Sequence, residues 1–376
     1  MFALEASTIF TPTKILKDTY IIVDDGKIVK LAKTLPKSVE KVDSYEGCII
    51  APGFVDIHTH GGFGVDIMYS SINDIMKFIE KLPETGVTSF VPSTVTDSFE
   101  SLKRFSEKFS SIGCVKGSEV VGIHFEGPYI NPKMAGAQPR DYIRLPSIKE
   151  VKFLSGFFKH TRKRMTIAPE VEGGIEFIKA LKDLNIIVSV GHTDAYYQQA
   201  LQAFSAGARI ATHIFNGMKS FHHREPGIVG AVLTCPNIYA ETILDLVHLH
   251  PATVELIFRC KSSKRMVLIT DAIAGAGLSD GAFKLGPIEI IVKDGVSRLP
   301  DGSLAGSTLT MDKAVRNAVK IGIPFIKALE MATLTPCKAM MLRKKGSIME
   351  CNDADFVVLD KDINVIATYL KGEKIF

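Results

Sequence analysis

The sequence predicts an α/β fold, a (β/α)8 TIM barrel that carries a small β-sandwich built from both ends of the chain. Short apolar, β-branched runs alternate with longer helical patterns through the middle of the chain, which favours a parallel sheet. Eight such runs follow one another, which favours a closed barrel. Both chain ends instead hold short β patterns separated by turn signals.

The two chain ends are expected to form one small domain. Asp25-Gly26 lies between apolar runs in residues 19–33, and Asp-Gly is a preferred two-residue hairpin turn. Residues 346–376 repeat this pattern, with Lys371-Gly372-Glu373 as the expected turn. Residues 1–50 plus 345–376 are therefore expected to form the β-sandwich domain, and residues 51–344 the barrel.

The elements of the barrel follow in order along the chain. The predicted strands are residues 49–57, 88–94, 120–128, 164–170, 186–192, 209–215, 238–248 and 266–272. Amphipathic patterns that predict helices include residues 71–82, 175–184 and 195–207.

Composition excludes several classes of protein. The chain has 376 residues, 46% hydrophobic and 23% charged, which is typical of a globular protein and not of a disordered or fibrous one. Its net charge is +4 and the charges are interspersed, so nucleic acid is not an expected partner. No apolar run approaches the ~20 residues that span a membrane, and the N-terminus lacks a secretory-signal pattern, so we expect a cytoplasmic protein without a membrane partner. Six scattered cysteines without a CxxC pair are expected to be buried thiols in a reducing compartment.

Polar side chains close six of the eight predicted strands. In chain order they are His58 and His60, His124 and Glu126, His192, His213, Asp245 and His248, and Asp271. The carboxyl ends of barrel strands meet at the face that carries the active site. Imidazole and carboxylate groups bind borderline divalent metals such as zinc. The sequence therefore predicts a metal site at this face.

The pair His58-Thr59-His60 can be accidental on its own, but histidines at i and i+2 share one face of a strand and can reach one ion. Glu126, His192 and His213 form a three-ligand set, the number typical of a catalytic zinc site with an open position for water. His124 is equally well explained as a hydrogen-bonded core residue, so it is not included among the ligands. Asp271 is the expected general base, because a carboxylate beside a metal can take a proton from water.

A second group of residues suggests substrate recognition. Asn216, Gly217 and His248 follow strands six and seven, and Arg224 could bind an anion such as phosphate or be an ordinary surface charge. Leu304, Ala305 and Gly306 lie in a small-residue stretch that either lets backbone groups approach a ligand or forms a plain loop.

These motifs resemble those of a known family. PGFVDIHTHGG (residues 52–62) is similar to the first-strand signature of the amidohydrolase superfamily, whose metal-dependent barrels carry a small β-sandwich. GIHFEGPYINPKMAGAQ, APE, VGHTDA, ATHIFNGM, HHREPGIVGA, LITDA and LAGSTLTM resemble, in order, the motifs of the N-acetylglucosamine-6-phosphate deacetylases.

The resemblance implies residue roles. Glu126, His192 and His213 would bind the principal metal, His58 and His60 a second ion, and Asp271 would be the catalytic acid/base. The sugar phosphate would contact Gly136, Ala137, Asn216, Gly217, Arg224, His248, Leu304, Ala305 and Gly306. The arginine of this family's REPG motif reaches the neighbouring subunit's site, so a homodimer is implied. One or two divalent metals are expected per subunit; zinc is favoured, and iron, cobalt and manganese suit the same ligands.

The implied reaction is hydrolysis of N-acetyl-D-glucosamine 6-phosphate to D-glucosamine 6-phosphate and acetate, in amino-sugar catabolism and cell-wall recycling. One departure concerns the seventh strand, where the family usually has Asp-Gly-x-His and this chain has Asp245-Leu246-Val247-His248. Two alternatives remain at this point. One is another amidohydrolase, of the dihydroorotase or N-acyl-amino-acid hydrolase type, and the other is a non-catalytic metal or sugar-phosphate binding protein that kept the barrel.

Overall fold

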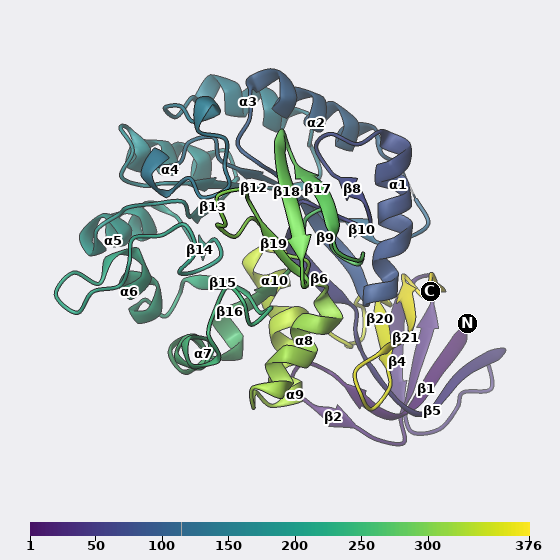
Figure 1. Cartoon of the computed structure of the whole chain (residues 1–376). Coiled ribbons are helices and arrows are strands. Elements are labelled where there is room, and N and C mark those ends of the chain that lie inside the picture. The colour runs from purple at the N-terminus through teal and green to yellow at the C-terminus, as the bar shows by residue number, and fades with distance from the viewer. Residues whose placement is uncertain (114) are drawn as a thin grey trace.

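The barrel is the centre of the molecule in the computed structural model, which describes residues 1–113 and 115–376 (Figure 1). Each strand pairs in parallel with the next strand in chain order. Strands one and eight are joined by a parallel bridge from Thr59 to Ala272, so the barrel is nearly closed. This confirms the predicted fold class. The strands are β6 (Phe54–Thr59), β9 (Val87–Thr94), β11 (Gly122–Glu126), β12 (Arg162–Ile167), β13 (Ile187–Val190), β14 (Ile210–Ala211), β15 (Tyr239–Ile243) and β16 (Met266–Ile269).

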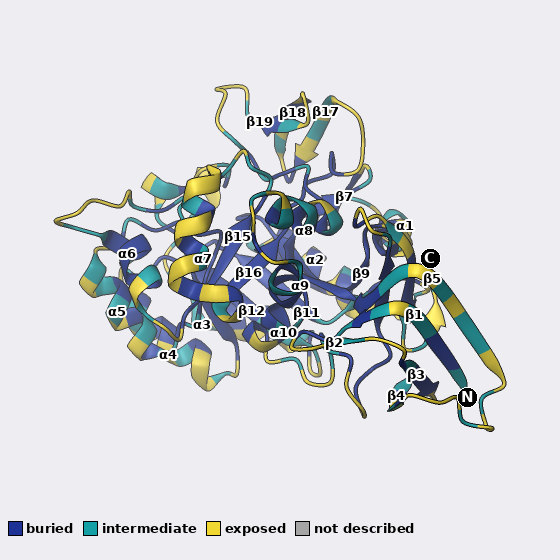
Figure 2. Cartoon of the chain, turned by 90° about the horizontal axis from the view of Figure 1, so that it is seen from below, coloured by how far each residue is buried: buried dark blue, intermediate teal, exposed yellow. Residues whose placement is uncertain are grey.

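Helices surround this barrel and most of them expose one face to solvent, while the strands inside are buried (Figure 2). They are α1 (Ile72–Lys81), α2 (Phe99–Ser111), α3 (Ile148–Gly156), α4 (Gly174–Asp183), α5 (Tyr197–Ala206), α6 (Gly227–Thr234), α7 (Pro251–Arg265), α8 (Met311–Lys320), α9 (Phe325–Ala332) and α10 (Leu334–Ala339). The helices predicted at 71–82, 175–184 and 195–207 are confirmed as α1, α4 and α5. No helix in the described part of the chain is both long and apolar enough to cross a bilayer.

A second sheet is built from both ends of the chain, and the two termini lie on the same side of the molecule (Figure 1). Its strands run in the order β22-β21-β20-β5-β1-β3-β4, with β2 paired to β1. This confirms that the chain ends form a small β unit, while its limits at 50/51 and 344/345 stay predictions. The strands are β1 (Phe2–Phe10), β2 (Ile15–Leu16), β3 (Tyr20–Asp24), β4 (Lys27–Ala32), β5 (Lys41–Pro52), β20 (Phe356–Leu359), β21 (Val365–Leu370) and β22 (Glu373–Lys374).

The hairpin expected at Asp25-Gly26 joins β3 and β4, and both turn residues have positive φ. At the C-terminus the turn is Lys371-Gly372 alone, because Glu373 already pairs with Leu370 in the β21–β22 hairpin.

The strand predicted at 49–57 is wrong in one respect, because these residues belong to two sheets. Ile49–Pro52 end β5 and pair with β20, and the barrel strand β6 begins at Phe54. Gly53 makes the crossing, and a Cβ added there would lie 2.2 Å from the Thr88 side chain. The close packing of the two sheets at this point therefore requires glycine.

An antiparallel sheet between β16 and α8 is absent from the sequence prediction. It comprises β17 (Gly281–Leu285), β18 (Ile288–Lys293) and β19 (Val296–Arg298), and it projects over one end of the barrel (Figures 1 and 2). The Gly286 N–H donates to Asp66 Oδ2 at 2.7 Å, which ties the first hairpin turn to the segment that follows barrel strand β6. Gly286-Pro287 and Asp294-Gly295, each between apolar runs, were the signals that could have predicted it.

The prediction that the cysteines are buried thiols is largely wrong. Cys337 is buried, but Cys260 and Cys351 are exposed and Cys48 and Cys235 are half-buried. All five are free thiols, and Cys114 lies outside the described residues.

Candidate active site

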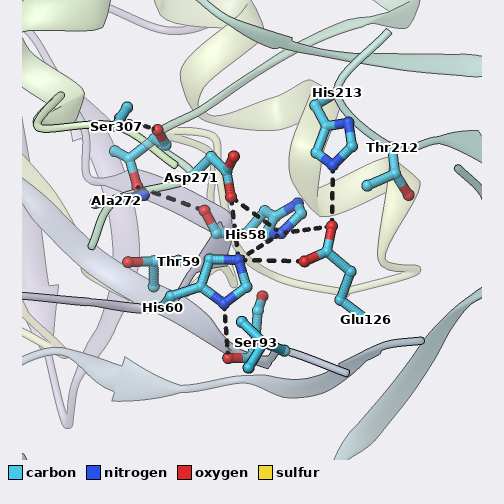
Figure 3. A network of polar contacts seen from close by, with 12 residues as sticks. His58, Thr59, His60, Ser93, Glu126, Thr212, His213, Asp271, Ala272 and Ser307 are labelled. Carbon is cyan, nitrogen blue, oxygen red and sulfur yellow. Dashed lines mark hydrogen bonds and ion pairs between the residues drawn. The ribbon is translucent and has the colours of Figure 1, made fainter. Parts of the chain in front are cut away.

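Six side chains from five barrel strands converge at the carboxyl end of the barrel. Figure 3 shows His58, His60, Glu126, His213 and Asp271 among them. They form two adjacent triads, each with its nitrogen and oxygen ligand atoms within 4.8 Å of one another and all members buried. The first triad is Glu126, His192 and His213, and the second is His58, His60 and Asp271.

Glu126 lies between the two triads and contacts both. Its Oε1 lies 3.2 Å from His192 Nε2, 2.9 Å from His213 Nε2 and 3.5 Å from His58 Nε2. Its Oε2 lies 3.3 Å from His60 Nε2. Glu126 therefore has the geometry of a carboxylate that can bridge two ions.

Asp271 faces the same point from the end of strand β16. Its Oδ1 lies 3.3 Å from His58 Nε2 and 3.1 Å from His60 Nε2, and the two imidazole Nε2 atoms are 3.2 Å apart. Asp271 N–H also donates to the His58 carbonyl at 2.9 Å, so the closure of the barrel itself holds this carboxylate beside the histidine pair.

All four imidazoles present Nε2 to the site because an oxygen acceptor binds Nδ1. His192 Nδ1 donates to the Met134 carbonyl at 2.9 Å, and His213 Nδ1 to the Asn216 carbonyl at 3.1 Å. His60 Nδ1 donates to the Ser93 carbonyl at 3.2 Å, and His58 Nδ1 to Glu241 Oε2 at 3.2 Å. These oxygens only accept, so each Nδ1 carries a proton and Nε2 is the nitrogen that each ring presents to the shared centre.

The electrostatics of the cluster are those of a cation site. Burial would lower the pKa of His60, but Asp271 and Glu126 outweigh it and raise that pKa to about 9. Burial would likewise raise the pKa of Asp271, but the imidazoles of His58 and His60 hold it below its usual value. The carboxylates thus stay ionised and favour positive charge at their centre, which a divalent ion would supply.

Several site residues have left-handed backbone conformations. His192, His213 and Asp271 have φ values of +47°, +29° and +49°. Non-glycine residues adopt such values at a cost of order 1–3 kcal/mol, typically where the surrounding structure fixes a functional geometry.

A cleft of about 600 Å³ opens over the two triads. Of the residues predicted to bind substrate, Gly136, Ala137, Asn216, Gly217, His248, Leu304 and Gly306 line it. Two do not. Ala305 is buried and is not among the lining residues, and Arg224 is exposed on a loop, where it contacts His223.

The loop after strand β15 shows why its second residue matters. Asp245 Oδ1 accepts from the N–H groups of Val247 and His248, each at 2.9 Å, and Asp245 Oδ2 accepts from His248 Nδ1 at 2.6 Å. Leu246 has φ +64° inside this turn, a conformation that suits glycine. The spacing of Asp245 and His248 therefore requires the left-handed residue between them, whichever side chain it carries.

The structure adds three residues to the cleft that the sequence analysis does not predict: Gln138, Ile243 and Leu285. Gln138 Nε2 donates to Glu126 Oε2 at 2.7 Å and its oxygen accepts from the Thr96 N–H at 2.5 Å. Leu285 comes from the β17–β18 hairpin, so only the tertiary structure reveals it. His124 bonds Ser93 Oγ and Thr166 Oγ1 below the site, as expected for a core histidine.

The family model of the amidohydrolases matches residues 49–375. The chain belongs to the amidohydrolase family. It is 34% identical to the N-acetylglucosamine-6-phosphate deacetylase of Bacillus subtilis (strain 168), with 98% of this chain and 95% of the relative covered. It is 37% identical to the N-acetylgalactosamine-6-phosphate deacetylase of Escherichia coli O157:H7, with 98% of both chains covered.

A solved structure is similar to this chain over its whole length. A mutant of the Mycobacterium smegmatis N-acetyl-D-glucosamine-6-phosphate deacetylase, in complex with N-acetyl-D-glucosamine 6-phosphate, superposes with a TM-score of 0.92 at 31% identity. The match covers 100% of this chain and 99% of that one. Among the described residues of this amidohydrolase, the two triads are the groups that could hold divalent metal ions.

Proposed function

We propose that this amidohydrolase hydrolyses the N-acetyl group of N-acetyl-D-glucosamine 6-phosphate and releases acetate and D-glucosamine 6-phosphate. The supporting observation is the pair of buried triads under a cleft lined by the motif residues, in a chain similar from end to end to deacetylases of such phosphosugars. The same resemblance supports roles in amino-sugar catabolism and cell-wall recycling.

The donor set fits one or two divalent ions. Glu126, His192 and His213 would hold the principal ion, and His58 and His60 a second one beside Asp271. Neutral imidazole nitrogens and carboxylate oxygens suit zinc, and also iron, cobalt or manganese. An ion bound there would lower the pKa of a water molecule and polarise the amide carbonyl.

Asp271 would move the proton. Its Oδ1 contacts both histidines, which leaves Oδ2 for the cleft that the side chain lines. As the water oxygen forms its bond to the acetyl carbon, Asp271 takes the water's proton. It then donates this proton to the departing amide nitrogen as the C–N bond breaks, so the amine leaves neutral. His248 lines the same cleft and would orient the substrate.

Phosphate recognition would involve a second copy of the chain. Arg224 is exposed and does not line the cleft of its own chain. In a homodimer it would reach the neighbouring cleft, where a guanidinium binds phosphate oxygens in a bidentate manner. A cytoplasmic location is proposed with it, supported by the five free thiols.

A second substrate has its own support, since the N-acetylgalactosamine-6-phosphate deacetylase of E. coli is 37% identical over nearly the whole chain. That sugar differs from the first only in the configuration of one hydroxyl group. The proposed chemistry is the same for both.

The test measures acetate release by the purified protein reconstituted with Zn²⁺. Its substrates are N-acetylglucosamine 6-phosphate, N-acetylgalactosamine 6-phosphate and unphosphorylated N-acetylglucosamine. We expect release from the first, abolished by a chelator, and little from the unphosphorylated sugar. No release from either phosphosugar, with metal bound, would refute the proposal.

Two variants assign the roles. Asp271→Asn keeps the size of the side chain but cannot carry the proton, so kcat should fall by about 10²–10⁴. Arg224→Ala should mainly raise KM. Normal turnover by Asp271→Asn with its metal intact would contradict the role of Asp271.

A further inference from the structure

One of the four site imidazoles has a different kind of hydrogen-bond acceptor on Nδ1. His60, His192 and His213 donate from Nδ1 to backbone carbonyl oxygens, whereas His58 donates to the side chain of Glu241. We infer that Glu241, held by Arg164, is a positioning residue that sets the metal affinity of the His58, His60 and Asp271 triad. This inference rests on the proposed metal-binding role of that triad.

Glu241 lies on strand β15 inside the barrel, where it is 0% exposed. Its Oε2 accepts from His58 Nδ1 at 3.2 Å and from the His213 N–H at 3.3 Å. One carboxylate oxygen therefore contacts a member of each triad, directly below the site.

Arg164 fixes the other oxygen of this carboxylate. It enters from strand β12, is 0% exposed, and forms an ion pair through Nη1 with Glu241 Oε1. Its donors also bond the Ile57 carbonyl at 3.2 Å, Ser189 Oγ at 2.5 Å and Thr212 Oγ1 at 3.2 Å. Contacts to several barrel strands thus hold the guanidinium, and with it Glu241, in one place.

This arrangement determines how His58 faces the centre. A carboxylate only accepts hydrogen bonds, so the proton of His58 stays on Nδ1 and its Nε2 points toward Asp271 Oδ1 at 3.3 Å. A carboxylate on the far nitrogen of an imidazole also makes the near nitrogen a better ligand. His124 packs edge-to-face against the His58 ring, with centroids 4.6 Å apart, so the ring is also fixed sterically.

Stability of the fold alone does not require the Arg164–Glu241 ion pair. Buried ion pairs are weak contributors to stability, and apolar residues of similar volume often replace them without loss. The Arg164–Glu241 pair supplies a fixed, negatively charged acceptor to His58 Nδ1. A backbone carbonyl at the same position would carry no net charge.

The test titrates metal-free protein with Zn²⁺ in competition with a chromophoric chelator and counts bound ions by native mass spectrometry. Glu241→Gln retains an oxygen but loses the charge, so the Zn²⁺ site of the His58, His60 and Asp271 triad should lose about tenfold in affinity while the other site is unchanged. The double variant Arg164→Met/Glu241→Leu removes the acceptor without leaving a buried charge, and the loss at that site should approach about 100-fold. This double variant also tests the inference if Glu241→Gln folds poorly.

Two controls separate the possible results. Glu330→Gln neutralises a buried carboxylate of helix α9 that bonds Ser263 of helix α7 and belongs to neither triad, and it should bind Zn²⁺ as wild type does. His58→Ala should lose one ion. If His58→Ala keeps both ions, the proposed ligand set fails and this inference fails with it. If His58→Ala loses an ion but Glu241→Gln retains wild-type affinity at both sites, or weakens both equally, the inference alone is overturned.

Discussion

A single methyl group at Gly217 should weaken metal binding by the first triad. Gly217 has φ +58°, and a Cβ added there would lie 2.9 Å from His192 Nδ1 and 3.3 Å from the Met134 carbonyl oxygen. These two atoms form the 2.9 Å hydrogen bond that orients His192. In Gly217→Ala the methyl group would therefore press directly on that hydrogen bond.

The expected effect has two parts. Alanine in a left-handed conformation costs about 1–2 kcal/mol relative to glycine, which should lower the free energy of unfolding of the metal-free protein by that amount. Disturbing the partner that orients a metal-binding histidine typically costs about 10–100-fold in affinity, or about 1.4–2.7 kcal/mol. Urea denaturation of the metal-free protein measures the first part, and Zn²⁺ titration measures the second.

Gly136→Ala is the matched control. Gly136 has φ +56°, but its added Cβ would meet only His192 Cε1, at the ordinary contact distance of 3.8 Å. It should show only the loss of stability that the left-handed conformation itself causes, and near wild-type Zn²⁺ affinity. Equal Zn²⁺ affinities in the two variants would refute the argument that the Met134 carbonyl controls metal binding through His192.

Three further results are expected. Leu246→Gly relieves a left-handed leucine at φ +64° and should raise the free energy of unfolding by about 1 kcal/mol in urea denaturation; a loss of stability would contradict the strain argument. Burial lowers the pKa of Lys261 to about 8 from 10.5, so the folded state binds fewer protons than the unfolded state between these values, and the stability of wild type relative to Lys261→Met should rise from pH 8 to 10.5. A flat difference across that range would count against it. Chelation of the metal should lower Tm and re-addition of Zn²⁺ should restore it, because an ion at 100 times its Kd stabilises the folded state by about 2.7 kcal/mol. Calorimetry measures this Tm, and a Tm that does not change with the chelator would contradict the prediction.

Local sequence patterns were sufficient for the main architecture. Short apolar runs predict the strands of the barrel, and segments with 3.6-residue periodicity between them predict its helices. Asp25-Gly26 predicts the hairpin between β3 and β4. Each of these signals depends only on residues close together in the chain. Polar residues at the strand ends were also sufficient to bring His58, His60, Glu126, His192, His213 and Asp271 together, since parallel barrel strands end at one face.

Contacts between segments far apart in the chain could not be predicted from these local patterns. The end of the sandwich strand β5 and the start of β6 form one apolar run, and only the packing of Gly53 against Thr88 separates them. The β17–β18 hairpin brings Leu285 over the cleft from outside the strand–helix repeat. Charged residues inside the runs at 164–170 and 238–248 were a signal that Arg164 and Glu241 have partners, but not which ones.

The sequence by itself thus determined the order of the elements and the residue types at the mouth of the barrel, because periodicity and strand ends are local properties. The tertiary structure alone decided which oxygen binds each Nδ1, that Glu241 rather than a backbone carbonyl orients His58, and that Arg224 lies outside the cleft of its own chain. Those features depend on groups far apart in the chain, since Arg164 and Glu241 are separated by 77 positions and His58 and Glu241 by 183. Such residues come into contact only when the barrel closes.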